Sequence, residues 1–279
     1  MSDRYQQWLD AAIQHLEELK ARGTKFVPVS PTTLAALSSA HSKPSQPPHA
    51  RTGTPQKNSE TPIASAEPVS ARPDREAAMA DLRARALVCR KCPNLAASRK
   101  NVVFGVGDIH SPLMFVGEAP GADEDEQGEP FVGKAGQLLT RIIQTMGFTR
   151  DTVYIANILK CRPDTPGQTI GNRKPTPEEM KTCLPYLLAQ IDLIQPRVMV
   201  ALGGTAVDGL LGKTVGITRL RGQWQEFRGI PVMPTYHPAY LLRNEVAGEK
   251  RKVWEDMLQV LERLGRPINE KQRNYFLKA

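Results

Sequence analysis

The four cysteines of the 279-residue chain are the residues whose spacing points most directly to chemistry. Two residues separate Cys89 from Cys92, which lets two thiolates bind one metal centre. Cys161 and Cys183 follow after gaps of 68 and 21 residues. Four thiolates fit tetrahedral zinc or a [4Fe–4S] cluster, and the long gaps do not distinguish the two. A redox dithiol is the alternative for Cys89 and Cys92, but it leaves the other pair unexplained.

A second candidate site is the loop that begins at Gly117. Residues 117–121 read Gly-Glu-Ala-Pro-Gly, which predicts a tight turn whose backbone N–H groups face a ligand. Five carboxylates lie between Glu118 and Glu126. The pattern fits a divalent-metal site, acid–base catalysis or a solvated loop. We do not expect a phosphate site, because the glycine-rich phosphate motifs are absent and carboxylates repel phosphate.

Three further side chains are candidates for binding a ligand. Phe131 lies between turn residues just before an expected helix. Its side chain either packs in the core or forms a stacking platform for a planar ligand. Asn157 interrupts an apolar strand, and a buried amide needs partners in the backbone or in a ligand. An isolated histidine is more often structural, but His237 follows the last expected strand and is fixed by Pro238, which makes it a better candidate for function than most.

Short apolar runs alternate with helical stretches between these residues, which predicts strands separated by helices. This order is typical of an α/β fold, a three-layer α/β/α domain with a mostly parallel central sheet. Ligands in such folds bind at the carboxyl ends of the strands. The expected strands are at 113–116, 153–159, 198–202 and 230–233. The expected helices are at 74–88, 135–146, 177–193, 205–211 and 250–264, with Met79, Leu82 and Leu87 packing from the first.

The chain divides into four segments. Residues 1–23 are expected to form a helix, which is either marginal or a docking helix for a protein partner. Residues 24–74 contain nine prolines among many Ser, Thr and Ala, which predicts a disordered linker, so that the domain follows a disordered N-terminal extension. Residues 75–268 have the pattern of one folded domain, and residues 269–279 form a basic tail.

Composition narrows the class of protein. The chain has no run of about 18 apolar residues, which argues against a membrane span. It also lacks an N-terminal secretory signal pattern, so we expect a cytoplasmic protein. The net charge of the chain is +8. The first 79 residues carry nine basic and eight acidic side chains, a net charge of +1, and the remaining 200 carry 28 and 21, a net charge of +7. This excess on the folded part favours a nucleic-acid partner, although the charges can equally be scattered.

Taken together, these motifs resemble the family 4 uracil-DNA glycosylases, the iron–sulfur branch of that superfamily. The resemblance extends over residues 87–264. It rests on the four cysteines, the 117–121 turn, Pro-Phe-Val-Gly-Lys-Ala-Gly at 130–136, Asn157, Lys-Cys-Arg-Pro at 160–163, Gly-Asn-Arg-Lys-Pro-Thr-Pro-Glu-Glu at 171–179 and His-Pro-Ala-Tyr-Leu-Leu-Arg-Asn at 237–244.

The resemblance implies a monomeric, nucleoid-associated repair enzyme. It would hydrolyse the N-glycosidic bond of deoxyuridine in uracil-containing DNA and leave an abasic site for base excision repair. It also implies that Cys89, Cys92, Cys161 and Cys183 hold a structural [4Fe–4S] cluster, which settles the metal in favour of iron.

The resemblance assigns roles in the uracil pocket. Phe131 would stack on the flipped base, and Asn157 would accept from uracil N3–H and donate to O4, which cytosine cannot match. His237 would donate to O2, where negative charge grows as the bond breaks.

The group that holds the attacking water is left open. The backbone of Glu118, Ala119 and Pro120 is expected to line the pocket. Ala119 stands where better-known members of the superfamily carry a water-positioning aspartate, so Glu118 or Glu124 is expected to hold the water. A related branch has a histidine that captures the sugar covalently in a loop corresponding to residues 164–181. That range contains no histidine here, so ordinary turnover is expected.

The resemblance also suggests DNA contacts. Arg243 is expected to grip a phosphate or enter the duplex, and Leu241 or Leu242 to fill the gap left by the flipped base. Core packing is the alternative for both leucines. Tyr275 and Phe276 in the tail could bind a sliding clamp, but we expect them to pack on the domain.

Two other functions remain as alternatives. The first is a non-catalytic DNA-binding or damage-sensing module with the same fold and cluster. The second is an electron-transfer protein whose working site is the cysteines, against which stand a single cluster in a large basic domain and a full set of pocket motifs.

Overall fold

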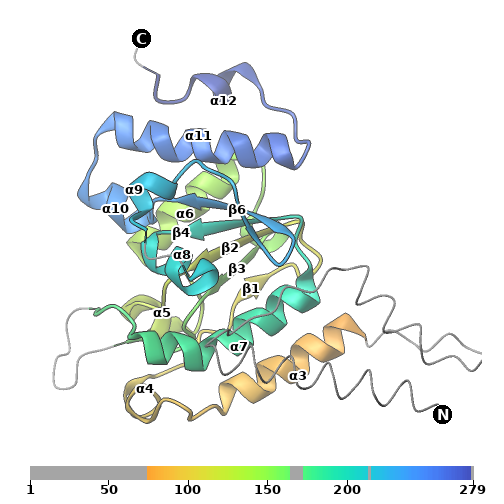
Figure 1. The fold of residues 1–279 in the computed structure, drawn as a ribbon, viewed down its shortest axis with the longest axis vertical. Coiled ribbons are helices and arrows are strands. Elements are labelled where there is room, and N and C mark those ends of the chain that lie inside the picture. Colours follow the sequence, from red (N-terminus) through yellow and green to blue (C-terminus); the bar gives the residue numbers. More distant parts are fainter. Residues whose placement is uncertain (1–73, 164–171, 213–214, 278–279) are drawn as a thin grey trace, which may run out of the picture. The chain divides into compact units, whose positions relative to one another are not determined.

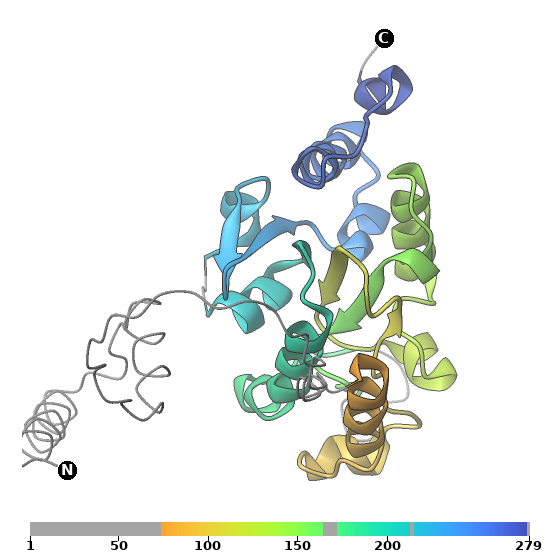
Figure 2. The same cartoon turned by 90° about the vertical axis from the view of Figure 1, so that its right-hand side faces the viewer.

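The computed structural model describes residues 74–163, 172–212 and 215–277. The helix expected at residues 1–23, the linker up to residue 73 and the loop at 164–170 lie outside the described residues. Within them, a six-stranded sheet carries helices on both faces (Figure 1, Figure 2). The three-layer α/β/α class expected from the sequence is therefore confirmed.

The sheet has the strand order β1-β3-β2-β4-β6-β5, and its four central strands are parallel. Both edge strands are antiparallel to their neighbours and were not expected, because they are two and three residues long and only partly buried. The strands are β1 (Val106–Gly107), β2 (Leu113–Gly117), β3 (Tyr154–Asn157), β4 (Val198–Leu202), β5 (Gln225–Phe227) and β6 (Ile230–Thr235).

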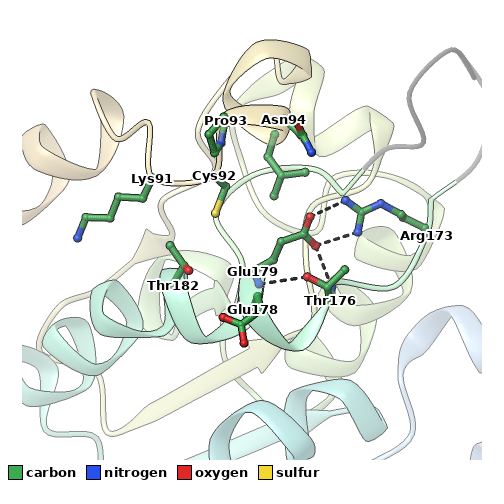
Figure 3. A pocket seen from close by; sticks show the side chains of 10 residues that line it. Lys91, Cys92, Pro93, Asn94, Arg173, Thr176, Glu178, Glu179 and Thr182 are labelled. Carbon is green, nitrogen blue, oxygen red and sulfur yellow. Dashed lines mark hydrogen bonds and ion pairs between the residues drawn. The ribbon is translucent and has the colours of Figure 1, made fainter.

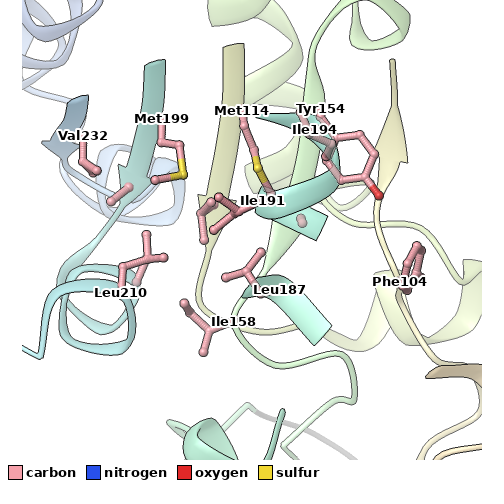
Figure 4. Close-up of a cluster of buried hydrophobic side chains, with 14 of the residues drawn as sticks. Phe104, Met114, Tyr154, Ile158, Leu187, Ile191, Ile194, Met199, Leu210 and Val232 are labelled. Carbon is pink, nitrogen blue, oxygen red and sulfur yellow. The ribbon is translucent and has the colours of Figure 1, made fainter. Parts of the chain in front are cut away.

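One face of the sheet is covered by α3 (Arg75–Leu87), α7 (Pro177–Ile194) and α8 (Gly204–Leu211). Figure 4 shows Met114 and Met199 of the sheet facing Leu187 and Ile191 of α7. Helix α3 lies alongside α7 and buries Met79 and Leu82 as expected (Figure 1). The expectation for Leu87 is wrong: its side chain is 39% exposed at the end of α3, where the neighbouring Ala86 turns inward instead.

The other face is covered by α6 (Lys134–Thr145) and α11 (Ala247–Arg263). Phe115 and Val200 of the sheet pack against Leu139 of α6 and Val260 of α11. The C-terminal segment folds back on this layer through α12 (Glu270–Asn274). Tyr275 packs on the domain as expected, but Phe276 does not follow the expectation, because it is 48% exposed. The Trp254 indole donates to the Gln272 carbonyl at 2.5 Å, and the Gln272 amide donates to the Thr145 carbonyl at 2.8 Å.

The remaining helices are short and lie in the connections, where no helix was expected. Two of them, α5 and α10, follow closely on the carboxyl ends of β2 and β6. None of the helices in the described ranges is both long and apolar enough to span a bilayer. The short helices are α4 (Pro93–Ser98), α5 (Ala122–Gln127), the 3-10 helix η1 (Arg150–Thr152), α9 (Ile217–Leu220) and α10 (Pro238–Arg243).

A buried ion pair joins the end of β6 to α11. Asp256 is fully buried, accepts from the Thr235 hydroxyl at 2.6 Å and pairs with the Arg221 guanidinium. Arg221 also donates to the Lys252 carbonyl at 2.6 Å. Because Thr235 is the last residue of β6, this pair fixes the point at which the chain leaves the sheet toward His237.

We expect Asp256→Asn to lower the free energy of unfolding by about 3 kcal/mol, because it leaves the Arg221 cation without its buried partner. Urea denaturation measures the change. Asp192→Asn is the matched control, since Asp192 pairs with Arg228 on the surface, where an ion pair contributes about 0.5 kcal/mol. Equal losses in the two variants would contradict a special role for the buried pair.

Candidate active site

A cavity of about 150 Å³ lies at the carboxyl ends of the parallel strands, where the fold class places a ligand. It brings together five of the residues singled out from the sequence: Ala119, Glu124, Phe131, Asn157 and His237. The other lining residues are Gly121, Ala135, Asn172 and Ala239. A cavity of this size suits a single flat ring better than a whole nucleotide.

The expectation that residues 118–120 line the cavity holds for Ala119 but not for Glu118 or Pro120. The Glu118 carbonyl accepts from the Leu159 N–H at 3.1 Å, so the backbone here is bound to the chain that continues from β3. Pro120 is buried. Of these three residues, only Ala119 therefore borders the cavity. Its small side chain leaves space for a ligand.

Asn157 lines the cavity and carries an unpaired acceptor. It is the last residue of β3, lies in register with Gly117 of β2, and is 2% exposed. Its Oδ1 is buried and has no hydrogen-bond partner in the described part of the chain. A Cβ on Gly117 would lie 2.4 Å from this oxygen and 2.5 Å from the Phe131 ring, so only glycine fits there. A ligand N–H is the natural partner of such an acceptor.

A fully buried lysine supports the turn behind Asn157. The Lys160 ammonium donates to the Asn157 carbonyl at 3.0 Å and to Gln190 Oε1 at 2.6 Å. Burial lowers the pKa of Lys160 to about 7. Its backbone N–H lies 3.2 Å from Cys183 Sγ, so one short turn serves both the cavity and the cysteines.

Phe131 and His237 form the aromatic wall of the cavity. Their ring centroids are 5.6 Å apart, and Phe131 is 6% exposed. The Phe131 backbone is left-handed, with a φ of 56°. A Cβ on Gly136 would lie 1.9 Å from the Phe131 carbonyl group, so this glycine is also required for close packing. Phe131 is thus both part of the core and a face of the cavity.

Glu124 lines the cavity with a carboxylate that is already bonded to the backbone. Oε1 accepts from the N–H groups of Val132 and Gly133 at 2.9 Å each, and Oε2 accepts from Gly121 at 3.0 Å. The carboxylate therefore joins the loop after β2 to the turn that carries Phe131. This fixes its position beside the cavity.

His237 is held as a neutral hydrogen-bond donor. Its Nδ1 accepts from the Ala239 N–H at 3.1 Å and so caps α10, which leaves the proton of the neutral ring on Nε2. Burial, with a smaller contribution from Arg243, lowers the pKa of His237 to about 4. At neutral pH the ring is therefore uncharged and has an Nε2–H to offer to a ligand.

The residues of α10 that were expected to contact DNA differ in exposure. Arg243 is exposed and Leu242 is half-buried. Leu241 is 3% exposed and packs with Tyr236 and Val253, so the core-packing alternative is correct for this leucine. Its side chain faces inward because it lies on the side of α10 that packs against α6 and Val253 of α11.

The four cysteines are free thiols in one region of the fold. Cys161 and Cys183 are buried in an apolar cluster against which Cys92 packs. Arg99 donates to Cys161 Sγ at 3.0 Å and to the Cys89 carbonyl at 2.6 Å. Burial raises the pKa of the Cys183 thiol to about 12. Across residues 74–163, 172–212 and 215–277, no group of three or more His, Cys, Asp or Glu side chains is arranged to hold a metal ion.

A larger cavity of about 390 Å³ lies between α4 and the start of α7 and is lined by Cys92. Figure 3 shows the Cys92 sulfur beside Glu179, whose carboxylate binds the Arg173 guanidinium at 2.6 and 2.8 Å and the Thr176 N–H at 2.8 Å. This larger cavity shares no lining residue with the cavity that His237 lines. The cysteine region thus has its own access to the surface.

No role was expected from the sequence for four residues of these two regions: Asn172, Arg150, Lys160 and Arg99. Asn172 lines the first cavity and accepts from Arg162 Nε at 3.1 Å. The Gly-Asn-Arg-Lys-Pro motif singled it out without giving it a role. Arg150, Lys160 and Arg99 all donate to backbone carbonyls, and such partners leave no signal in the sequence.

A family model described as the uracil DNA glycosylase superfamily matches residues 104–258, a range that contains every residue lining the first cavity. The chain is 46% identical over 185 residues to a type-4 uracil-DNA glycosylase of Thermotoga maritima, covering 66% of this chain and 93% of the relative. It is 41% identical to a protein of the same name from Archaeoglobus fulgidus, covering 60% and 87%. A third, from Sulfurisphaera tokodaii, is 40% identical, covering 68% and 86%.

We expect His237 to make the stability of the protein depend on pH. The folded-state pKa of about 4 lies below the ordinary value of 6.5, so the unfolded chain binds a proton more readily than the folded one. The contribution of His237 is complete above pH 6.5 and falls by about 3 kcal/mol as the pH approaches 4. Urea denaturation of the wild type and His237→Asn across this range measures it. A difference between the two proteins that stays constant with pH would contradict the shift.

Proposed function

Because the chain belongs to the uracil-DNA glycosylase superfamily, and to its type-4 branch, we propose that it hydrolyses the N-glycosidic bond of deoxyuridine in DNA. Uracil is released and an abasic site remains, the first step of base excision repair. The observation that carries this function is the unpaired Oδ1 of Asn157, a residue that lines one cavity together with Phe131 and His237.

Recognition of the base rests on Asn157 and Phe131. A uracil inside a duplex must leave the base stack before it reaches the cavity, which costs a few kcal/mol. In the cavity it stacks on Phe131, and Asn157 Oδ1 accepts from N3–H while the amide donates to O4. Cytosine has no N3–H and carries an amine at position 4, so it would leave the buried amide unpaired. A site built in this way rejects cytosine strongly.

Bond cleavage is assisted by His237. Negative charge develops on the departing base. The Ala239 N–H occupies Nδ1, so the neutral ring has its proton on Nε2 and donates it to uracil O2. The backbone bond to Nδ1 fixes the ring before the substrate arrives. The hydrogen bond strengthens as the charge grows, so it stabilises the transition state more than the bound substrate.

The attacking water is held beside Ala119. Ala119 cannot orient water, and Glu118 does not line the cavity, so we assign the water to Glu124 with the amide of Asn172 as its neighbour. The Glu124 carboxylate also stabilises the sugar as it becomes cation-like. Leu242 and Arg243 are the residues of α10 that reach DNA, by filling the vacated position and by binding a phosphate.

We infer that Cys89, Cys92, Cys161 and Cys183 hold a [4Fe–4S] cluster, as expected for the family. The donor set fits, because four thiols stand free of disulfides and the Arg99 and Lys160 cations lie where they balance thiolate charge. A bound cluster supplies a structural link between the segment before α4, the turn after β3, and α7. It contributes no group to the cavity with His237.

We expect the purified protein to release uracil from a single-uracil oligonucleotide, so that subsequent alkali treatment breaks the strand at the abasic site. Asn157→Asp should slow uracil release by about 100-fold or more, because the variant loses the donor to O4. Gel analysis under single-turnover conditions measures the rate. Asn274→Asp, on the exposed end of α12, is the matched control. Binding of DNA by the wild type without any scission would favour a non-catalytic module instead, and an unimpaired Asn157→Asp would remove Asn157 from recognition.

We expect the protein to absorb visible light, because an iron–sulfur cluster is coloured and zinc is not. Arg99→Met should lower the absorbance per chain, since Cys161 loses the cation that stabilises its thiolate. Arg90→Met, an exposed arginine between the first two cysteines, is the control. A colourless protein that contains zinc would refute the cluster, whereas reversible redox cycling without uracil release would revive the electron-transfer alternative.

A further inference from the structure

The proposed stacking residue has an unusual backbone conformation. A φ of 56° at Phe131 lies in the left-handed region, which a bulky L-residue rarely enters without support. The turn at residues 130–133 leads directly into α6, whose first residue is Lys134. The direction of the Phe131 ring therefore depends on whatever holds this turn in place.

Two charged side chains hold the turn from opposite sides. Arg150 Nη1 donates to the Phe131 carbonyl at 3.0 Å, and Nη2 donates to the Pro130 carbonyl at 2.7 Å. The Glu124 carboxylate accepts from the next two N–H groups, those of Val132 and Gly133, at 2.9 Å each. Four consecutive residues thus have backbone groups bonded to a fixed charge, carbonyls to the cation and amides to the anion.

The Arg150 guanidinium is committed to this turn rather than to solvent. Both terminal nitrogens donate to the carbonyls, and Nη1 also lies 3.4 Å from the Thr140 hydroxyl of α6. The Arg150 side chain is half-buried, and Arg150 is the first residue of the short helix η1 that leads into β3. An arginine near a DNA-binding site usually binds a phosphate. The Arg150 guanidinium does not, because its donors are used by the two carbonyls.

We propose that Arg150 is a positioning residue for uracil recognition: by holding the carbonyls of Pro130 and Phe131, it sets the plane of the Phe131 ring on which the base stacks. The inference rests on the proposed function. It assigns Arg150 to the base-binding step and to no contact with the DNA backbone.

Free uracil is the most direct probe, because it binds the cavity without any phosphate. Arg150→Met should raise the inhibition constant of free uracil by about tenfold, the loss expected when one base–aromatic stack is weakened. Arg150→Lys should recover part of this, since an ammonium group can serve one of the two carbonyls. The salt dependence of DNA binding should be unchanged in both, whereas loss of a phosphate contact would reduce its slope.

A double-mutant cycle shows whether Arg150 acts through the ring. Phe131→Leu removes the stacking face and keeps an apolar side chain. In that background Arg150→Met should change the inhibition constant by less than about twofold, because no ring is left to orient. Arg141→Met, which removes an exposed arginine from α6, is the control for loss of charge near the site.

Thermal denaturation identifies variants that fail to fold, and Gly136→Ala then provides an independent test. Its Cβ would lie 1.9 Å from the Phe131 carbonyl group that Arg150 binds, so it should displace this group and raise the same inhibition constant. If the wild-type protein releases no uracil from DNA, the proposed function itself is wrong. An active wild type with an unchanged inhibition constant in Arg150→Met, or a reduced salt slope in that variant, overturns the role of Arg150 alone.

Discussion

The cavity depends on one backbone turn being held in a conformation that it would not adopt alone. A left-handed residue other than glycine costs roughly 1–2 kcal/mol. A hydrogen bond to a charged group contributes about 1.5–3 kcal/mol, and residues 130–133 receive four such bonds, so the charges outweigh the strain. Gly117 and Gly136 supply the space that the turn and its ring occupy. The aromatic wall is thereby in place before any ligand arrives, and binding need not order it.

A second turn, at the end of β3, links the cavity to the cysteines. Asn157 begins it and Cys161 ends it, and the Lys160 ammonium binds its first carbonyl from within the core. A buried ammonium is tolerated only where acceptors surround it, and here a backbone carbonyl and the Gln190 amide oxygen do so. The shared turn would let the proposed cluster affect the cavity although it supplies no group to it. A change that displaces Cys161 would also displace Asn157, the amide that we propose recognises the base.

The sequence predicted the central layer well, because strands of a buried parallel sheet are continuous apolar runs. The strand at 198–202 has the predicted bounds, and the carboxyl-end rule placed Asn157 and His237 in one site. Short antiparallel edges carry no such pattern. Leu241 was ambiguous because an apolar residue on a six-residue helix fits the core and the surface equally. Arg150 escaped because its partners are carbonyls, which every residue has.

The two ring nitrogens of His237 have different tasks. Nδ1 caps the start of α10, and we propose that Nε2 serves the cavity. Any replacement during evolution must therefore satisfy a helix as well as a ligand. Asparagine and serine are good N-caps that also carry a donor, so the helix survives either exchange while the reach and strength of the donor change. A substitution at this position can therefore keep the fold and the sheet unchanged while it alters the hydrogen-bond donor of the cavity.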